Sequence, residues 1–366
     1  MAHGNGRSPV AIVGGGPAGM ALALALKLHG VNAEVFEARE REAVRRDPRV
    51  LALSDGARQI LEWLGVWSGL SATPIEAIHI SQRGGFGRTL LRATELDLKT
   101  LGWVLSASDL IAALDTAVSA AGIAYRGNTK VGAGETASFP LTAFAEGAVE
   151  AGAGEMRDYG QHAVLCSVSV AAPHHNVAWE RFTSDGPVAL LPLGDRYAVV
   201  LTCADETVAD IKALDDAAFL ALLQQRFGTR HRFTAASPRT AYPLGLRYRP
   251  NPVGERQVWL GNAAQTLHPV AGQGFNLALR DIWELAQVVG ASADPGAPEV
   301  LAAYAGGRQT DRRGAIAFTD LLIDGFASGF APLKHARGAG LLALDLLPPL
   351  RAFVAKRMIY GARAWP

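Results

Sequence analysis

The sequence predicts an α/β fold in which a parallel-sheet domain carries an inserted antiparallel sheet and a helical C-terminus. Three observations lead to this prediction. Residues 9–128 read as alternating strands and helices, and residues 239–290 return to that pattern. From about 163 to 203 the chain reads instead as short strands broken by turn residues. We therefore expect the parallel-sheet domain to comprise 1–75, 100–162 and 239–300, the antiparallel sheet 76–99 and 163–238, and the helical region 301–366.

The first sign of chemistry is a glycine-rich turn after a buried strand. Val10 to Val13 is a short apolar run, and Gly14, Gly16 and Gly19 then complete a GxGxxG pattern. An Ala/Leu-rich helix continues from Met20 to His29. In such a turn the first glycine permits a tight bend, the second lets the backbone approach a pyrophosphate, and the third lets the helix pack on the strand. The free N–H groups at the helix N-terminus favour phosphate.

A second strand, Ala33 to Phe36, ends at Glu37, 18 residues past Gly19. A carboxylate there can accept hydrogen bonds from both ribose hydroxyls of an adenosine and would repel a 2′-phosphate. The pocket therefore suits FAD or NAD rather than NADP. A purely structural glycine turn is the alternative, but strand, helix, second strand and acid all stand in the order that a dinucleotide site needs.

A second glycine-rich stretch lies almost 250 residues further along the chain. Val258 to Leu260 reads as a strand ended by Gly261-Asn262, His268-Pro269 follows, and Gly272-Gln273-Gly274 opens a helix from about Phe275 to Val289. A glycine-rich loop that leads into a helix N-terminus binds anions. If the first stretch holds an adenosine and a pyrophosphate, the N–H groups near the start of this helix can stabilise the negative charge of a reduced flavin ring.

With these motifs in view, the sequence resembles a known family. The segment GNAAQTLHPVAGQGFNLALRD is close to a signature of the ubiquinone-biosynthesis hydroxylases, a branch of the FAD monooxygenases related to p-hydroxybenzoate hydroxylase. DPRVLALSDGARQILEWLGVW, HISQRGGFGRTLL and WERFTSDGPVALLPL agree with it, and the last is most similar to the 2-polyprenyl-6-methoxyphenol hydroxylase-like members. The likeness spans nearly the whole chain and implies a Rossmann-like FAD-binding domain with an inserted substrate-binding sheet.

The resemblance assigns site residues in two groups. Cofactor binding is expected at Gly14, Gly16, Pro17, Ala18, Gly19, Glu37, Ala38, Arg49, Gly261, Asn262, Ala271, Gly274, Phe275 and Asn276. The catalytic loop is expected at His268, Pro269, Gly272, Gln273 and Gly274. Two of these side chains keep an alternative: Arg49 either contacts the flavin or is a surface charge, and His268 either moves a proton or only bonds to backbone.

The activity that the resemblance implies is insertion of one oxygen of O2 into a polyprenylated phenol during ubiquinone biosynthesis. The cofactor is FAD, NAD(P)H is the transient reductant, and a flavin hydroperoxide is the oxidant. Other ubiquinone-biosynthesis proteins are then candidate partners. Two alternatives stay open: a hydroxylase of a small soluble aromatic, and a non-catalytic homologue that binds lipid quinone precursors or scaffolds a biosynthetic complex.

One departure from the family pattern bears on cofactor reduction. The family usually has an ADGxxSxxR pattern between the two glycine-rich stretches. The nearest match here is Ala145-Glu146-Gly147, without the serine and arginine, and the region from about Thr129 to Gln161 is short. The departure puts reduction by a nicotinamide, and tight flavin binding, in question.

Composition limits the remaining classes. The net charge of the 366-residue chain is +1, so nucleic acid is not an expected partner. Cys166, Cys203 and the His174-His175 pair show no metal-ligand spacing, and no metal is expected. The tail from 331 to 366 combines the apolar segment LLALDLLPPL with a net charge of +5. Such a tail either sits on an anionic membrane surface or packs on the domain. We expect a cytoplasmic protein, either free or peripheral at the inner face of the cytoplasmic membrane.

Overall fold

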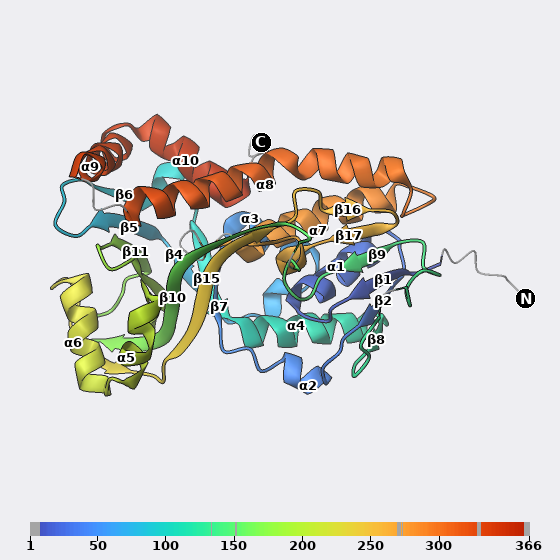
Figure 1. The fold of residues 1–366 in the computed structure, drawn as a ribbon, viewed down its shortest axis with the longest axis horizontal. Helices are drawn as coiled ribbons and strands as arrows, with labels where there is room; N and C mark the ends of the chain where they lie inside the picture. Colours follow the sequence, from blue (N-terminus) through green and yellow to red (C-terminus); the bar gives the residue numbers. More distant parts are fainter. Residues whose placement is uncertain are drawn as a thin grey trace, which may run out of the picture.

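The computed structural model describes residues 8–361 except 133, 151, 269–271, 273 and 328–330. It contains a nucleotide-binding layer beside a large antiparallel sheet, with long helices across the top of both in the view of Figure 1. The predicted α/β fold, the inserted sheet and the helical C-terminus are confirmed.

The nucleotide-binding layer is a six-stranded sheet in the order β16-β17-β9-β1-β2-β8. Its strands are parallel except for β16, which pairs antiparallel with β17. Helices α1, α4 and α7 share one apolar core with it, so β1 is buried along its whole length. The bounds are β1 Val10–Val13, α1 Pro17–Leu28, β2 Ala33–Phe36, α4 Ala107–Ala120, β8 Ala124–Arg126, β9 Thr142–Phe144, β16 Val253–Gly254, β17 Gln257–Trp259 and α7 Gly274–Gly290.

The antiparallel sheet, called the lid sheet below, has the order β18-β15-β10-β13-β12-β11-β5-β6, with β14 paired to β10. One face packs against α5 and α6, and the other shares a core with α10. Asp215 begins α6 by accepting a hydrogen bond from the Ala218 N–H (2.8 Å). The bounds are β5 Ala77–Gln82, β6 Arg88–Arg92, β10 Glu155–Val170, β11 Val177–Phe182, β12 Val188–Leu193, β13 Arg196–Ala204, α5 Val208–Ala213, α6 Asp216–Phe227, β14 Phe233–Ala236, β15 Thr240–Tyr248, β18 Gln265–Thr266 and α10 Pro348–Tyr360.

The lid sheet begins earlier and ends later than the sequence pattern indicated. The expected boundary between 162 and 163 falls inside β10, which starts at Glu155, and residues 240–248 form β15. The segment EMRDYGQH has no apolar alternation because it is largely exposed, so its strand character depends on pairing with β15. These two long strands run side by side from the lid sheet toward the nucleotide-binding layer (Figure 1).

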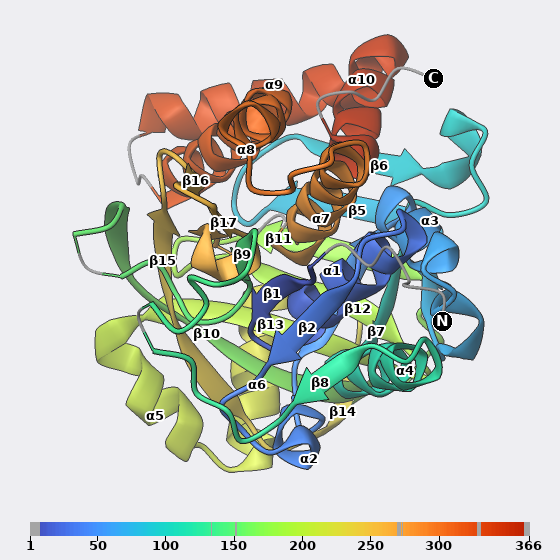
Figure 2. The ribbon, with the colours of Figure 1, turned by 90° about the vertical axis from the view of Figure 1, so that its right-hand side faces the viewer.

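The remaining elements connect and cover these layers. A small sheet pairs β3 and β4 with β7, and the long α8 runs along the molecule while α9 lies over β5 and β6 (Figures 1 and 2). The bounds are α2 Arg41–Val44, β3 Val50–Ser54, α3 Asp55–Trp63, β4 Thr73–Ile75, β7 Gly102–Ser106, α8 Pro298–Ala327 and α9 Ala331–Leu346, with 3-10 turns at Trp67–Gly69, Ala93–Leu96, Asp205–Thr207 and Gly261–Ala263.

Candidate active site

The glycine-rich turn after β1 has the geometry of a phosphate cradle. Gly14 has φ +113°, and a Cβ there would lie 2.5 Å from the Glu146 Cβ. A Cβ on Gly19 would lie 1.8 Å from the Gly14 carbonyl oxygen, so only glycine lets α1 approach the turn this closely. Around Gly16, in contrast, a Cβ would meet nothing within 4 Å. That open space, between Gly14 and the start of α1 at Pro17-Ala18, fits a pyrophosphate.

Glu37 stands at the end of β2, beside this turn, with 1% of its surface exposed. Its carboxylate accepts hydrogen bonds from the Gly15 N–H (2.9 Å) and from the N–H and Nε of Arg39 (3.0 and 2.8 Å). Burial raises the pKa of Glu37, but these hydrogen bonds outweigh burial and bring it below its usual value. The carboxylate is therefore ionised at neutral pH, and with three of about four acceptor positions used it can still accept a ribose hydroxyl. Ala38, the next residue, is exposed.

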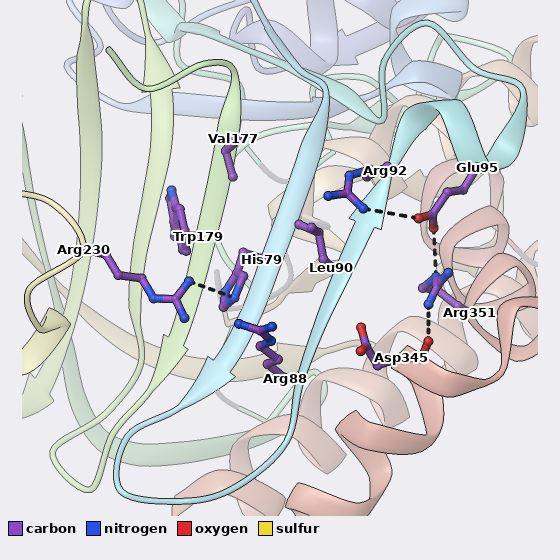
Figure 3. A pocket seen from close by; sticks show the side chains of 10 residues that line it. All are labelled: His79, Arg88, Leu90, Arg92, Glu95, Val177, Trp179, Arg230, Asp345 and Arg351. Carbon is purple, nitrogen blue, oxygen red and sulfur yellow. Dashed lines mark hydrogen bonds and ion pairs between the residues drawn. The ribbon is translucent and has the colours of Figure 1, made fainter. Parts of the chain in front are cut away.

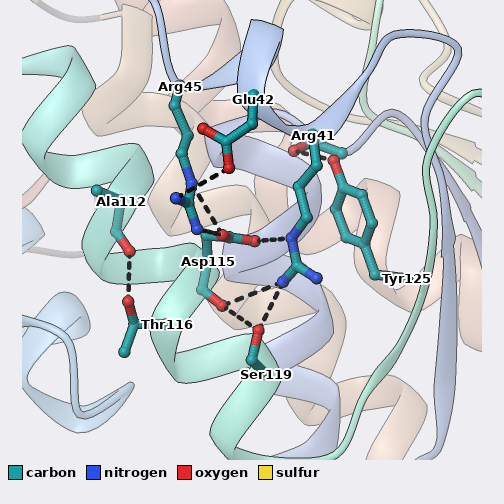
Figure 4. Close-up of polar contacts among 9 residues, drawn as sticks. Arg41, Glu42, Arg45, Ala112, Asp115, Thr116, Ser119 and Tyr125 are labelled. Atoms are coloured by element: carbon teal, nitrogen blue, oxygen red, sulfur yellow. Dashed lines mark hydrogen bonds and ion pairs between the residues drawn. The ribbon is translucent and has the colours of Figure 1, made fainter.

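A second set of contacts holds the turn from the side and explains a glycine outside the GxGxxG pattern. A Cβ on Gly15 would lie 2.3 Å from the Tyr125 hydroxyl oxygen, which donates a hydrogen bond to the Gly15 carbonyl (3.4 Å). Arg41 lies over the Tyr125 ring, 4.6 Å from its centroid, and pairs with the buried Asp115 on α4 (Figure 4). Arg45 pairs with the same carboxylate and fastens α2 to α4. Sequence reasoning missed this support because its members are far apart in the chain.

The departure from the ADGxxSxxR pattern lies at the same edge of the sheet. Because β17, β9 and β1 are parallel neighbours, the segments that follow them end side by side. Glu146 follows β9 and packs against Gly14, and Gly261 follows β17, where an added Cβ would lie 3.4 Å from the Ala18 methyl carbon. Burial, and then Glu37, raise the pKa of Glu146. The shortened segment therefore still packs against the first glycine of the turn, and Asn262, which follows β17, is exposed.

Asn276 fixes the second glycine-rich stretch, and it does so through its side chain. Its Nδ2 donates to the carbonyl oxygens of Gly272 (2.6 Å) and Ala52 (2.9 Å), and its Oδ1 accepts from the Ser54 N–H (2.8 Å). The side chain is therefore occupied by protein groups and holds the loop against β3. Of the groups expected at the cofactor here, the backbone N–H groups at the start of α7 remain, with Gly274 exposed and Phe275 partly buried.

His268 lies just before this loop, in a buried position after β18. Burial lowers its pKa to about 4, so its imidazole is neutral at physiological pH. Its ring meets the edge of Tyr159 at 5.7 Å between centroids. Tyr159 lies in an irregular part of β10 and donates to Asp320 of α8 (2.6 Å). Pro269, Ala271 and Gln273, the other expected members of the loop, lie outside the described residues.

A buried polar network positions the start of this loop. Asp281 of α7 accepts from Arg308 of α8 (2.6 Å) and from the Gln265 amide on β18 (2.8 Å). Arg312 donates to the other end of the Gln265 amide (2.7 Å). Asp281 ends the signature segment but was not expected in the site. Its charge holds α7, α8 and β18 together, and β18 begins at Gln265, three residues before His268.

Arg49 lies at the entry to β3 and is half-exposed, with its guanidinium paired to the Asp47 carboxylate (2.6 to 3.0 Å). The main chain of Arg49 accepts a hydrogen bond from Ala107, at the start of α4. The predicted flavin contact of Arg49 stays a prediction.

An apolar cavity of about 100 Å³ adjoins Gly272 and Asn276. Its walls come from β3, the lid sheet and the C-terminal helix α10. They include Ile75, Ile78, Leu91, Leu101, Met358 and Ile359. A ring held here would lie beside the loop and against aliphatic side chains.

The fold and the two glycine-rich stretches define a flavin-dependent oxidoreductase of the class that binds FAD across the ends of a parallel sheet. A family model described as "FAD binding domain" matches residues 7–138 and 145–319. The chain belongs to this family and is a FAD-dependent monooxygenase.

Relatives of the chain agree with that assignment, and a solved structure shares its fold. The chain is 33% identical to "Ubiquinone hydroxylase UbiL" of Rhodospirillum rubrum, over 93% of this chain and 87% of the relative. It is 30% identical to "3-demethoxyubiquinol 3-hydroxylase" of Escherichia coli, over 96% and 97%. The structure of PqsL from P. aeruginosa in complex with 2-aminobenzoylacetate has the same fold, with a TM-score of 0.75 at 19% identity over 92% of this chain and 99% of that one.

The residues present fit FAD, because the open space at Gly16, the carboxylate of Glu37 and the N-terminus of α7 match its pyrophosphate, ribose and ring in turn. Bound FAD supplies the reduction of O2 and the transfer of one oxygen atom. The chain's own contribution is positional: Asn276 holds the loop, His268 is neutral just before the loop, and the adjoining cavity would give a ring apolar surroundings.

Proposed function

We propose that this enzyme hydroxylates the ring of a polyprenylated phenol in ubiquinone biosynthesis. In the balanced reaction a ring C–H and O2 react with NAD(P)H and a proton to give ring C–OH, water and NAD(P)⁺. The observation that carries the substrate assignment is the apolar cavity beside Gly272, whose lining is aliphatic and includes α10. The names of the relatives, a ubiquinone hydroxylase and a demethoxyubiquinol hydroxylase, support the same substrate class.

Oxygen incorporation into a defined substrate is the direct test. The purified protein, loaded with FAD, is incubated with NADH or NADPH, ¹⁸O2 and a polyprenylated phenol with a short tail. We expect substrate-stimulated NAD(P)H oxidation and a product that contains one ¹⁸O atom. The same phenol without its prenyl tail is the matched control, and it should be turned over more slowly because it leaves apolar surface of the cavity uncovered.

Two outcomes would contradict the proposal. Equal turnover of the tail-free phenol would point to a hydroxylase of small soluble aromatics. FAD binding without any ¹⁸O incorporation from either substrate would exclude ring hydroxylation of this substrate class.

A further inference from the structure

A cavity of about 550 Å³ lies on the face of the lid sheet that points away from the flavin loop. Side chains alternate along β5 and the edge strand β6: Ile78 and Leu91 line the apolar cavity by Gly272, whereas His79 and Leu90 line this second one. An adjoining cavity of about 450 Å³ shares Arg88, Arg230 and Asp345 with it. We call the two adjoining cavities, which lie among β5, β6, β11 and α9, the arginine groove; Figure 3 shows the side chains that line the larger one.

The groove is strongly cationic. Five guanidinium groups and two carboxylates line it. The arginines are Arg88, Arg92, Arg181, Arg230 and Arg351, and the acidic residues are Glu95 and Asp345. Glu95 pairs with Arg351 (3.0 Å) and more distantly with Arg92 (3.8 Å). Among the described residues, Arg88, Arg181 and Arg230 form no ion pair with a carboxylate. As far as the described side chains show, the floor of the groove therefore holds three positive charges without a carboxylate partner.

The side chains that contact Arg230 are uncharged and therefore do not neutralise the positive charge of the groove. Arg230 donates to the Nε2 atom of His79 (3.3 Å) and lies over the Trp179 ring, 5.3 Å from its centroid. Burial, and then Arg230 and Arg88, lower the pKa of His79 to about 4, so His79 accepts this bond as a neutral ring. Burial and then Arg230 also lower the pKa of Arg181. Such mutual repulsion is relieved when an anion enters the groove.

An exposed apolar surface adjoins the groove where α9 meets α10. Five large side chains there are between 41% and 66% exposed, and we call them the α9–α10 corner: Leu342, Leu346, Leu347, Leu350 and Phe353. Leu342 itself lines the groove. Asp345, near the end of α9, and Arg351, in the first turns of α10, belong to both the groove and this part of the chain. No single described helix has the length and composition to cross a membrane, but the stretch of α9 from His335 together with α10, bent by 99°, does.

We propose that the α9–α10 corner and the arginine groove together dock the enzyme onto an anionic phospholipid surface. The corner side chains enter the boundary between head groups and acyl chains, and the groove binds lipid phosphates at head-group depth. The pairing of the two features selects this partner, because a soluble anion makes no use of the exposed corner and a neutral apolar partner makes no use of the arginines. Docking of this kind places the enzyme peripherally at the inner face of the cytoplasmic membrane.

The orientation also suits the chemistry, and this step rests on the function proposed above. Helix α10 presents Phe353 at the corner, while Met358 and Ile359 of the same helix line the apolar cavity beside Gly272. One helix therefore joins the docking surface to the cavity. On the proposed function, this helix would bring the cavity close to the membrane from which a lipid-tailed substrate arrives.

Vesicle sedimentation with the FAD-loaded protein tests the docking itself. Vesicles of phosphatidylcholine with phosphatidylglycerol are compared with vesicles of phosphatidylcholine alone. We expect binding only to the first kind, weakened by high salt. The double variant R88Q/R230Q should bind about 30-fold more weakly, since a near-surface arginine contributes roughly fivefold in partition. The control K27Q/K212Q removes the same charge at exposed sites elsewhere and should change binding less than about twofold.

A second pair of variants tests the corner. L346S/F353S should weaken binding by roughly tenfold because less apolar surface can be inserted. L28S/L321S, whose side chains are 57% and 68% exposed away from the corner, should leave it unchanged. All four variants should keep turnover of a soluble short-tailed phenol, so failure to fold is detected separately.

Three results would overturn the proposal. One is vesicle binding that neither the groove nor the corner variant weakens. Another is tight binding of inorganic pyrophosphate in the groove by a protein that ignores vesicles. The third is a dimer that L346S/F353S converts to a monomer, which would assign the corner to a second copy of the chain. Vesicle binding without hydroxylase activity would instead sustain the docking and refute only the proposed function.

Discussion

Replacing Gly16 with alanine should separate cofactor binding from folding. Gly16 has φ −74° and ψ −173°, an extended conformation that any residue adopts, and an added Cβ would meet no protein atom within 4 Å. The unliganded protein should therefore keep its stability or gain about 0.4–1 kcal/mol, because alanine restricts the unfolded chain. The new methyl group would, however, occupy the space that we assign to the pyrophosphate. Loss of one hydrogen bond between a backbone N–H and a phosphate, about 1.5–3 kcal/mol, weakens FAD binding by about 10- to 150-fold.

Two matched variants make the result specific. Gly19→Ala puts its Cβ 1.8 Å from the Gly14 carbonyl oxygen, so strand and helix must separate, and the stability of the unliganded protein should fall by about 3 kcal/mol. Gly306→Ala lies in open space on α8 and should raise stability by about 0.5–1 kcal/mol without affecting FAD. Urea unfolding of the unliganded proteins and fluorescence titration with FAD give both quantities. Wild-type FAD affinity in Gly16→Ala, or a marked loss of its stability, would refute the assignment of that space to the pyrophosphate.

Three further changes address the second glycine-rich stretch. The pKa of His268, about 4 in the folded protein against roughly 6.5 unfolded, means that the unfolded chain takes up a proton first as pH falls. The free energy of unfolding should therefore be unaffected by His268 above pH 6.5 and should fall by about 3 kcal/mol as the pH is lowered to 4. In His268→Gln this part of the pH dependence, measured by urea unfolding, should be flatter. Asn276→Asp keeps the acceptor but loses the donor to Gly272 (2.6 Å), and we expect a loss of about 2–4 kcal/mol in unfolding free energy together with weaker FAD binding. Asp281→Asn leaves the buried Arg308 with one fewer carboxylate and should lower the free energy of unfolding by about 3 kcal/mol. An unchanged free energy of unfolding would show that the network does not support the fold.

The parts of the site that the sequence predicted are those in which a short segment contains its own physical reason. The turn from Gly14 to Gly19 combines a strand, three glycines and a helix start. The close contacts at Gly14 and Gly19 are those that the pattern indicated, and the space at Gly16 is open as a pyrophosphate would require. Glu37 likewise follows its strand directly and lies in the crevice. In both cases the relevant neighbours are close in sequence or are fixed by parallel pairing.

The parts that sequence reasoning missed depend on contacts between distant segments. Gly15 is required because Tyr125, 110 residues away, contacts it, and the position of Glu146 follows from the pairing of β9 with β1. The extension of β10 to Glu155 could not be inferred because that half of the strand is polar on both faces and is defined by its partner. The side-chain hydrogen bonds of Asn276 to Gly272, Ala52 and Ser54 were likewise not foreseen, whereas the predicted contact of its backbone N–H with the flavin stays a prediction.

The same distant contacts explain why an exposed C-terminal region can matter for a buried loop. Gln265, the residue that starts β18, bonds to both Asp281 and Arg312, so the entry to the flavin loop is set jointly by α7 and α8. The irregular part of β10 adds Tyr159, which touches His268 on one side and Asp320 of α8 on the other. Breaking a buried ion pair costs more than its formation contributes, because the remaining charge is left without a partner. A change in the middle of α8 should therefore displace the loop and lower FAD affinity although it touches no cofactor, whereas changes confined to the α9–α10 corner should leave the loop in place.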